Sequence, residues 1–377
     1  MNIKTCLTSG LFSIASIFTI FGETTHNNSP KVVTRAAFDI GSGETKVTVA
    51  DVDLVAQRVL KIRHQAFIPL NLRAAVETNP DGLLSETSIQ DLNVAVRKLQ
   101  EQAKQHGAQE SSGIASSIFR TAKNGSQVLE RVQKDTGLTA VVLPQSEEGE
   151  IGFASAVAVS NQPKDKLIVW DSGGGSFQIT TYNKGKMEVY GEEFASTSAL
   201  KALYGIRNIL FGSAPVHPVS TQEALQLIDT IRQQFTLPPE WTSSREKRVV
   251  AIGGGGSSIF AEAATTLGKL TFTKEEVLQL MMEACDKTKE ELSYFPNPQH
   301  AIVSLSLLYT VMDHCGIQEL TYYRTNGSTE GLLITPRFWK TGVNHAQLIK
   351  TAAKTPTLSL CSNSDLVKRS QAISAWL

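Results

Sequence analysis

Two similar segments constrain the fold of this chain more than any other feature. The first is VVTRAAFDIGSGETKVTVADVD, residues 32–53, and the second is LIVWDSGGGSFQITTY, residues 167–182. Each ends an apolar run in an aspartate (Asp39 or Asp171), continues through a turn of glycine and serine, and then begins a second strand-like run. A duplicated strand–turn–strand unit predicts two similar lobes with a cleft between them.

Helical and strand-like patterns alternate around these segments. The run at 85–107 places apolar residues three and four apart and predicts an amphipathic helix that Ser85 or Ser88 caps. Asn183-Lys184-Gly185 is typical of a hairpin turn. Further strands are expected near 113–117 and at 248–252, and helices at 126–134, 196–204, 220–235, 257–267, 274–292, 301–314 and 328–335. The order predicts an α/β protein.

The glycine turns indicate an anion site. A turn of glycine and serine exposes several backbone N–H groups with no side chain in the way, and phosphate is the usual ligand of such a nest. The candidate phosphate-binding residues are Gly41, Ser42, Gly43, Gly173, Gly174, Gly175 and Ser176. Asp39 and Asp171 are candidates to hold a hydrated Mg²⁺ or to orient water. Neither turn matches a P-loop or a dinucleotide-binding fingerprint, and a tight hairpin turn is the alternative for each.

Composition narrows the class of ligand. The 377 residues suit two ordinary domains. Lys and Arg together number 36, as do Asp and Glu, so the net charge predicts no nucleic-acid partner and no attraction to membrane surfaces. The seven histidines show no ligand spacing, and the four cysteines form no CxxC pair. We interpret the cysteines as small buried thiols.

The two ends of the chain differ from the rest. Residues 1–31 contain an apolar run, Leu7–Phe21, behind Lys4. The run is short for a membrane span and fits a secretory signal, but the cleavage site is poor, which leaves a short anchor or an uncleaved extension open. Contact with a membrane is expected only through this segment if it stays uncleaved. Residues 346–377 form a polar, weakly patterned tail.

Six motifs occur in an order that resembles one family. They are FDIGSGETKVTVADV, SSIFRTAKNGSQVLERV, PQSEEGEIGFASAV, LIVWDSGGGSFQIT, AIGGGGSSI and NGSTEGLL. Together they resemble the exopolyphosphatase/guanosine pentaphosphate phosphohydrolase (Ppx/GppA) family of the actin-like superfamily, over roughly residues 33–338. The ordered set is more specific than any one motif.

The resemblance implies two ribonuclease H-like lobes. Lobe I would comprise residues 32–146 and about 322–345, and lobe II residues 147–321. It also implies a Mg²⁺-dependent hydrolase that releases terminal phosphate from polyphosphate or pppGpp, a cytoplasmic location unless residues 1–22 act as a signal, and a homodimer.

The resemblance also assigns roles to residues. Glu148 would be the catalytic base, Arg120 would meet the phosphate chain, and Asp171 would lie near the metal. The chemistry of these residue types agrees, because a carboxylate in the first turn of a helix capped by Ser146 can take a proton from water. The planar guanidinium of an arginine suits phosphate oxygens.

Three positions depart from the family pattern. Glu44 ends the first turn where the family has serine, Gln178 replaces an acidic residue near the metal, and Thr329 stands where the family has arginine. Two alternatives therefore stay open beside the hydrolase. One is a non-catalytic phosphate- or alarmone-binding protein, and the other is an ATP-dependent member of the superfamily that uses the glycine turn at 253–258.

Overall fold

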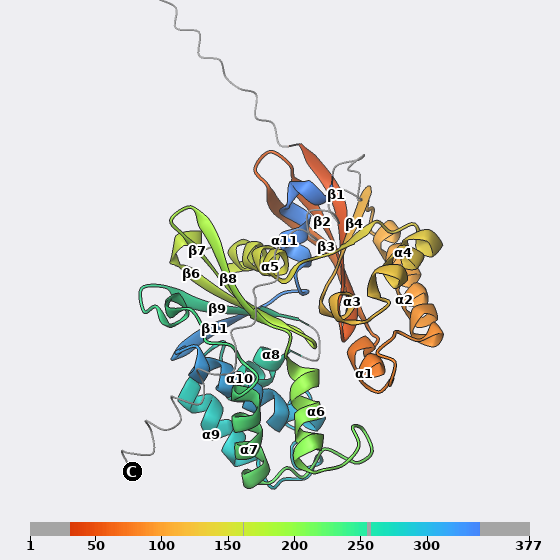
Figure 1. The fold of residues 1–377 in the computed structure, drawn as a ribbon. Helices are drawn as coiled ribbons and strands as arrows, with labels where there is room; N and C mark the ends of the chain where they lie inside the picture. The colour runs from red at the N-terminus through yellow and green to blue at the C-terminus, as the bar shows by residue number, and fades with distance from the viewer. Residues whose placement is uncertain (1–30, 161, 255–257, 340–377) are drawn as a thin grey trace, which may run out of the picture.

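The computed structural model describes residues 31–160, 162–254 and 258–339, and its elements form two α/β lobes (Figure 1). The sequence predictions for residues 1–30 and for the tail lie outside this range. Within it, no helix is both long and apolar enough to cross a membrane.

The first lobe is built on a five-stranded sheet of order β3-β2-β1-β4-β5. Its strands are β1 (Val32–Ile40), β2 (Glu44–Asp53), β3 (Arg58–Pro69), β4 (Glu110–Ala115) and β5 (Ala140–Val142). Its helices are α1 (Leu72–Glu77), α2 (Glu86–Gln105), α3 (Ser117–Thr121) and α4 (Gly125–Thr136). The predicted strand at 113–117 is thus displaced toward the N-terminus, and Ser117 begins α3 instead.

The second lobe contains a six-stranded sheet of order β10-β11-β9-β6-β7-β8. Its strands are β6 (Leu167–Ser172), β7 (Phe177–Asn183), β8 (Lys186–Glu192), β9 (Arg248–Gly253), β10 (Thr271–Thr273) and β11 (Glu319–Arg324). Its helices are α6 (Ser196–Ile206), α7 (Thr221–Arg232), α8 (Ile259–Leu267), α9 (Lys274–Ala284) and α10 (Ala301–His314). The helix predicted over 274–292 therefore ends eight residues early.

The two sheets repeat one topology. In each, three antiparallel strands (β1–β3 or β6–β8) are followed by two strands that run parallel to the first, β4 and β5 or β9 and β11. The β7–β8 turn has Lys184 and Gly185 at positive φ, as a two-residue hairpin requires. The duplication predicted from the two glycine segments is therefore visible in strand order.

The last helix of each half packs on the sheet of the other half. Helix α5 (Gln145–Ser160) follows β5 but contacts β6, β7 and β8, whereas α11 (Thr329–Ile334) follows β11 but contacts β1, β2 and β3. The two helices cross between the lobes (Figure 1). The boundary expected at about residue 322 falls inside β11, so the chain returns to the first lobe only after Arg324.

Burial explains why the strands are so apolar. Alternate residues of β1 enter different cores, with Phe38 and Ile40 packed against α2 and α4 and Ala37 packed toward α11. In the second lobe Trp170 is fully buried against Phe177 and Phe260. A strand covered on both faces shows a continuous apolar run.

Local signals in the sequence account for several smaller features. The Ser85 side chain caps α2, as expected, by accepting a hydrogen bond from the Ser88 amide. The amphipathic pattern of α2 places its apolar residues in the hydrophobic core of the first lobe. Cys285 and Cys315 are buried free thiols, which agrees with the interpretation from sequence.

Candidate active site

The two glycine turns have the same backbone geometry. The Gly41 amide donates to the Glu44 carbonyl at 3.0 Å, and the Gly173 amide donates to the Ser176 carbonyl at 3.0 Å. Asp39 pairs in register with Lys46, and Asp171 pairs with Gln178. The turns are therefore equivalent positions of the duplicated hairpin, and Lys46 corresponds to Gln178.

The turns meet across the cleft between the lobes. A methyl group added to Gly174 would lie 3.6 Å from the Gly43 nitrogen. One added to Gly175 would lie 2.6 Å from both the Ser42 hydroxyl oxygen and Arg73 Nη2. Bare backbone is thus needed at Gly175 because side chains of the first lobe occupy the space where its Cβ would stand.

A cavity of about 450 Å³ extends inward from the turns. Among the residues that line it are all of the predicted phosphate-binding residues, together with Asp39, Asp171 and Glu148. The loop and short 3₁₀ turn before α10 add Asn297 and His300. The structure thus brings together both turns and all three predicted carboxylates, and Arg120 reaches them through Glu148.

Glu148 projects from the first turn of α5. The helix starts at Gln145 and the Glu148 amide bonds to the Pro144 carbonyl, so Ser146 lies inside the helix and the predicted cap at Ser146 is wrong. The Glu148 side chain is only 13% exposed. Burial raises its pKa to about 7, with Arg120 opposing the shift and Asp171 and Asp39 adding to it.

Arg120 is fixed by contacts on every side. Its Nη1 lies 2.6 Å from Glu148 Oε2 and 2.9 Å from the Leu143 carbonyl oxygen. Its Nη2 lies 3.4 Å from Ser176 Oγ. The guanidinium therefore connects the carboxylate of Glu148 to the second glycine turn.

Asp171 and Asp39 approach each other from the ends of β6 and β1. The Ser328 hydroxyl donates to Asp171 Oδ2 at 3.1 Å, and the Ser328 amide donates to Asp39 Oδ2 at 3.3 Å. Burial raises the pKa of Asp171 to about 6; Lys46 opposes the shift and Asp39 adds to it. A methyl group on Gly152 would lie 2.9 Å from Asp171 Oδ2, so this glycine lets α5 carry Glu148 close to the aspartate.

Lys46 is a site residue that the sequence interpretation missed. Its side chain is 14% exposed and its Nζ lies 3.3 Å from Glu44 Oε1. Burial lowers the pKa of Lys46, but the charges of Asp39, Glu44 and Asp171 outweigh burial and raise it overall. The signal was present, because a residue at this place in the hairpin register must face Asp39.

The three departures from the family pattern have different structural settings. Glu44 is neutralised by Lys46. Gln178 is 2% exposed and donates to Ser176 Oγ at 3.2 Å. Thr329 lies outside the cavity, where its hydroxyl contacts that of Thr48 at 2.7 Å. Only Glu44 and Gln178 therefore bear on the site.

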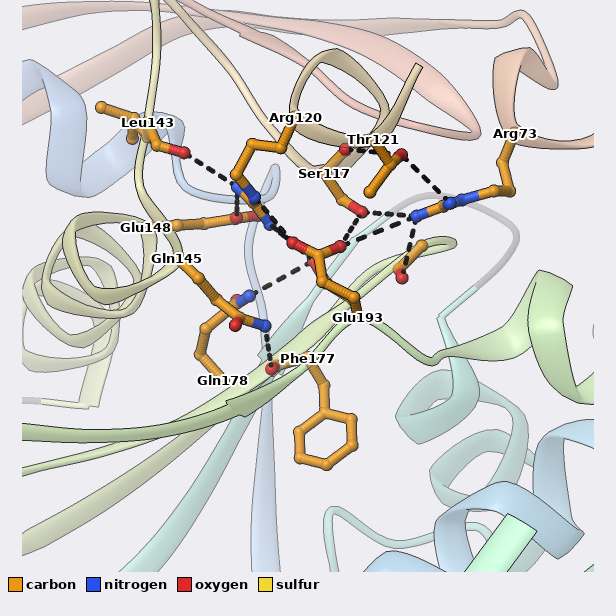
Figure 2. A network of polar contacts seen from close by, with 12 residues as sticks. Arg73, Ser117, Arg120, Thr121, Leu143, Gln145, Glu148, Phe177, Gln178 and Glu193 are labelled. Carbon is orange, nitrogen blue, oxygen red and sulfur yellow. Dashed lines mark hydrogen bonds and ion pairs between the residues drawn. The ribbon is translucent and has the colours of Figure 1, made fainter. Parts of the chain in front are cut away.

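Figure 2 shows a second group of residues that the sequence interpretation did not find. Glu193, in the loop after β8, is surrounded by Arg73, Ser117 and Arg120 of the first lobe. Arg73 lies in a short helix and Glu193 in a loop, and neither position carries a periodic or motif signal.

The oxygen atoms around Asp171 bear on whether the site can hold a divalent cation. Within the described ranges, no three His, Cys, Asp or Glu side chains converge as a metal cage. Magnesium, however, is commonly held by one or two carboxylates together with substrate phosphates. The hydroxyl of Ser172, next to Asp171, is buried with no hydrogen-bond partner, and hard oxygen atoms of this kind suit the ion.

A family model described as the Ppx/GppA phosphatase family matches residues 52–294. The chain belongs to this family. The match includes Arg120, Glu148 and the second glycine turn, and begins after the first turn.

Individual relatives of this family are distant. Exopolyphosphatase 1 of Mycobacterium tuberculosis is 25% identical over 143 residues, which are 38% of this chain and 40% of the relative. An uncharacterized protein of Streptomyces coelicolor is 26% identical over 204 residues, or 52% of this chain and 55% of the relative. The chain thus spans about half the length of these curated relatives or less.

Solved structures agree with the two-lobe fold. A Ppx/GppA family member from Aquifex aeolicus superimposes with a TM-score of 0.62 at 17% identity, covering 85% of this chain and 99% of that chain. An exopolyphosphatase from Cytophaga hutchinsonii gives a TM-score of 0.63 at 14% identity, covering 80% and 97%. At these identities the likeness shows the fold alone, which is the one predicted from sequence.

Proposed function

We propose that this family member hydrolyses phosphoanhydrides and releases terminal phosphate from inorganic polyphosphate, from pppGpp, or from both. The observation that carries the proposal is the Glu148–Arg120 pair at 2.6 Å, next to the second of two amide-rich turns that line one cavity. A base, a fixed positive charge and a phosphate cradle are the parts that phosphoryl transfer requires. Relatives named exopolyphosphatase support the same assignment.

Glu148 is proposed as the general base. Its carboxylate takes a proton from water while the water oxygen bonds to the terminal phosphorus and the bridging P–O bond breaks. The products are orthophosphate and a chain shortened by one phosphate. Arg120 and the amides of the turns stabilise charge on the phosphate oxygens. A Mg²⁺ ion, which Asp171 and Asp39 would hold together with substrate oxygens, would neutralise phosphate charge.

A binding protein without activity is the second candidate. Lys46 already places a cation against Asp39 and Asp171, and Gln178 supplies an amide where the family has an acid. Both features favour anion binding with a weaker hold on metal. The ATP-dependent alternative relies on the turn at 253–258, part of which lies outside the described residues.

Phosphate release separates these candidates. The full chain is incubated with Mg²⁺ and with medium-chain polyphosphate, pppGpp or ATP in parallel. Release from polyphosphate or pppGpp at a rate well above that from ATP supports the hydrolase. Tight binding of polyphosphate without release from any substrate favours the binding protein, and release from ATP alone favours the ATP-dependent member.

A further inference from the structure

Glu193, in the loop after β8 of the second lobe, contacts side chains of the first lobe. Its Oε1 receives Arg120 Nε at 2.7 Å and Arg120 Nη2 at 2.6 Å. Its Oε2 receives the hydroxyl of Ser117. One carboxylate thus accepts from both Nε and Nη2 of Arg120, the arginine that is proposed to bind phosphate (Figure 2).

A second arginine faces the same carboxylate without bonding to it. Arg73 Nη2 lies 3.7 Å from Glu193 Oε2, beyond hydrogen-bond distance. The Arg73 residue is 7% exposed, and its Nε is buried with no hydrogen-bond partner. Burying a donor without a partner is costly, so Arg73 keeps a donor that a further acceptor oxygen could use.

The two arginines also lie beside the second glycine turn. Arg73 Nη2 donates to Ser117 Oγ at 2.5 Å and to the Gly175 carbonyl at 3.1 Å. Arg120 Nη2 lies 3.4 Å from Ser176 Oγ. A phosphate held by the two arginines would therefore continue the line of anion contacts that the turn begins.

We propose that Arg73, Ser117 and Arg120 form an anion subsite that Glu193 fills in the free protein and that a phosphate group takes by displacing Glu193. The proposal rests on the proposed function for the source of that phosphate, a polyphosphate chain or nucleotide. A tetrahedral phosphate offers more acceptor oxygens and more charge than a carboxylate, and both favour paired arginines. Displacement also removes a direct contact between the lobes, since Glu193 belongs to one lobe and its partners belong to the other.

Inorganic phosphate is the probe for the test, because binding it requires no turnover. Its dissociation constant is measured by calorimetry on the full chain at fixed ionic strength. Glu193→Gln keeps the side chain's size and removes the competing charge, so it should bind phosphate about tenfold more tightly, the equivalent of one charge-assisted hydrogen bond. Arg73→Met should bind about tenfold more weakly. In the double variant the gain from Glu193→Gln should shrink markedly, because both changes act on one subsite.

Glu192→Gln is the matched control. Glu192 is the neighbour of Glu193 and carries the same charge, but it contacts Thr236 instead of the arginines, and its variant should bind phosphate like the wild type. Thermal melting confirms that each variant is folded. If Glu193→Gln does not fold, Glu193→Ser replaces it in the same measurement.

Two results would overturn the subsite. One is that Glu193→Gln binds phosphate as tightly as the wild type or more weakly. Glu193 would then only hold the two lobes together. The other is an unchanged affinity in Arg73→Met. Failure of the proposed function gives a different result. The variants would bind inorganic phosphate with the expected affinities, but the protein would release no phosphate from any substrate.

Discussion

The β1–β2 and β6–β7 hairpins share one backbone design but obtain their positive charge in different ways. Both place an aspartate at the end of the first strand and close the turn with the same 3.0 Å bond. The first hairpin carries its own cation, Lys46, opposite Asp39. The second has neutral Gln178 at that place and receives Arg120 and Arg73 from the other lobe. The two turns thus share their geometry and differ in the source of their positive charge.

This difference has a consequence for how the cleft works. The first turn has its cation on its own hairpin, since Lys46 faces Asp39 and Glu44 of the same lobe as well as Asp171 of the other lobe. The second turn depends on the approach of the lobes, because its arginines belong to the first lobe. Removing Lys46 should therefore act mainly on stability, and removing an arginine at the second turn should act mainly on ligand binding.

The largest expected effect comes from removing the internal cation of the first hairpin. Lys46→Met leaves buried carboxylates without their partner and should lower the free energy of unfolding by roughly 3–5 kcal/mol. Gln178→Met removes only one neutral hydrogen bond and should cost about 1 kcal/mol. Urea unfolding of both variants measures the difference. Equal losses of unfolding free energy in the two variants would show that the charge of Lys46 does not distinguish it from Gln178.

The next effect concerns space beside the turns. A methyl group at Gly175 meets Arg73 Nη2 at 2.6 Å, whereas one at Gly43 has nothing within 4 Å. Gly175→Ala should displace the flexible end of Arg73 and weaken phosphate binding about tenfold, the loss of one charge-assisted bond. Gly43→Ala should weaken it much less. Calorimetry with inorganic phosphate measures both affinities. A larger loss of phosphate affinity in Gly43→Ala than in Gly175→Ala would contradict the difference between the turns.

The smallest effect separates the two serine hydroxyls. Ser42 Oγ is buried with no hydrogen-bond partner, so Ser42→Ala should change the free energy of unfolding by less than about 0.5 kcal/mol. Ser176 Oγ contacts both Gln178 and Arg120, and Ser176→Ala should cost about 1 kcal/mol. Denaturant unfolding is the measurement, and a stability loss in Ser42→Ala as large as in Ser176→Ala would contradict the difference in partners.

Much of the fold and part of the site could be predicted from sequence. The Asp–turn–strand repeat predicted the two lobes because the turn, the strand end and the alternation are all local in the chain. Glu148 and Arg120 came from motifs, and the structure places them in contact. Lys46 could have been found from the hairpin register with Asp39.

Other features depend on contacts between distant segments. Arg73 and Glu193 are 120 residues apart and meet only because the lobes close on each other. The Ser146 cap failed because Pro144 lies one turn before Glu148 and accepts its amide. Strand β11 joins the second sheet by pairing with β9, and no local pattern in the sequence indicates that pairing.

We propose that Glu148 activates water in this cleft. The most direct test is the rate of phosphate release from polyphosphate with Mg²⁺ across pH 5–9, a range set around the pKa of Glu148 of about 7, for the wild type and Glu148→Gln. Glu147→Gln is the control, since Glu147 pairs with Arg337 at 2.9 Å away from the cavity. Because a base works only when deprotonated, wild-type kcat/KM should rise as the pH increases through about 7. Glu148→Gln should lose about 10²–10⁴-fold in rate, and Glu147→Gln should behave like the wild type. A Glu148→Gln variant that releases phosphate as fast as the wild type would contradict the claim.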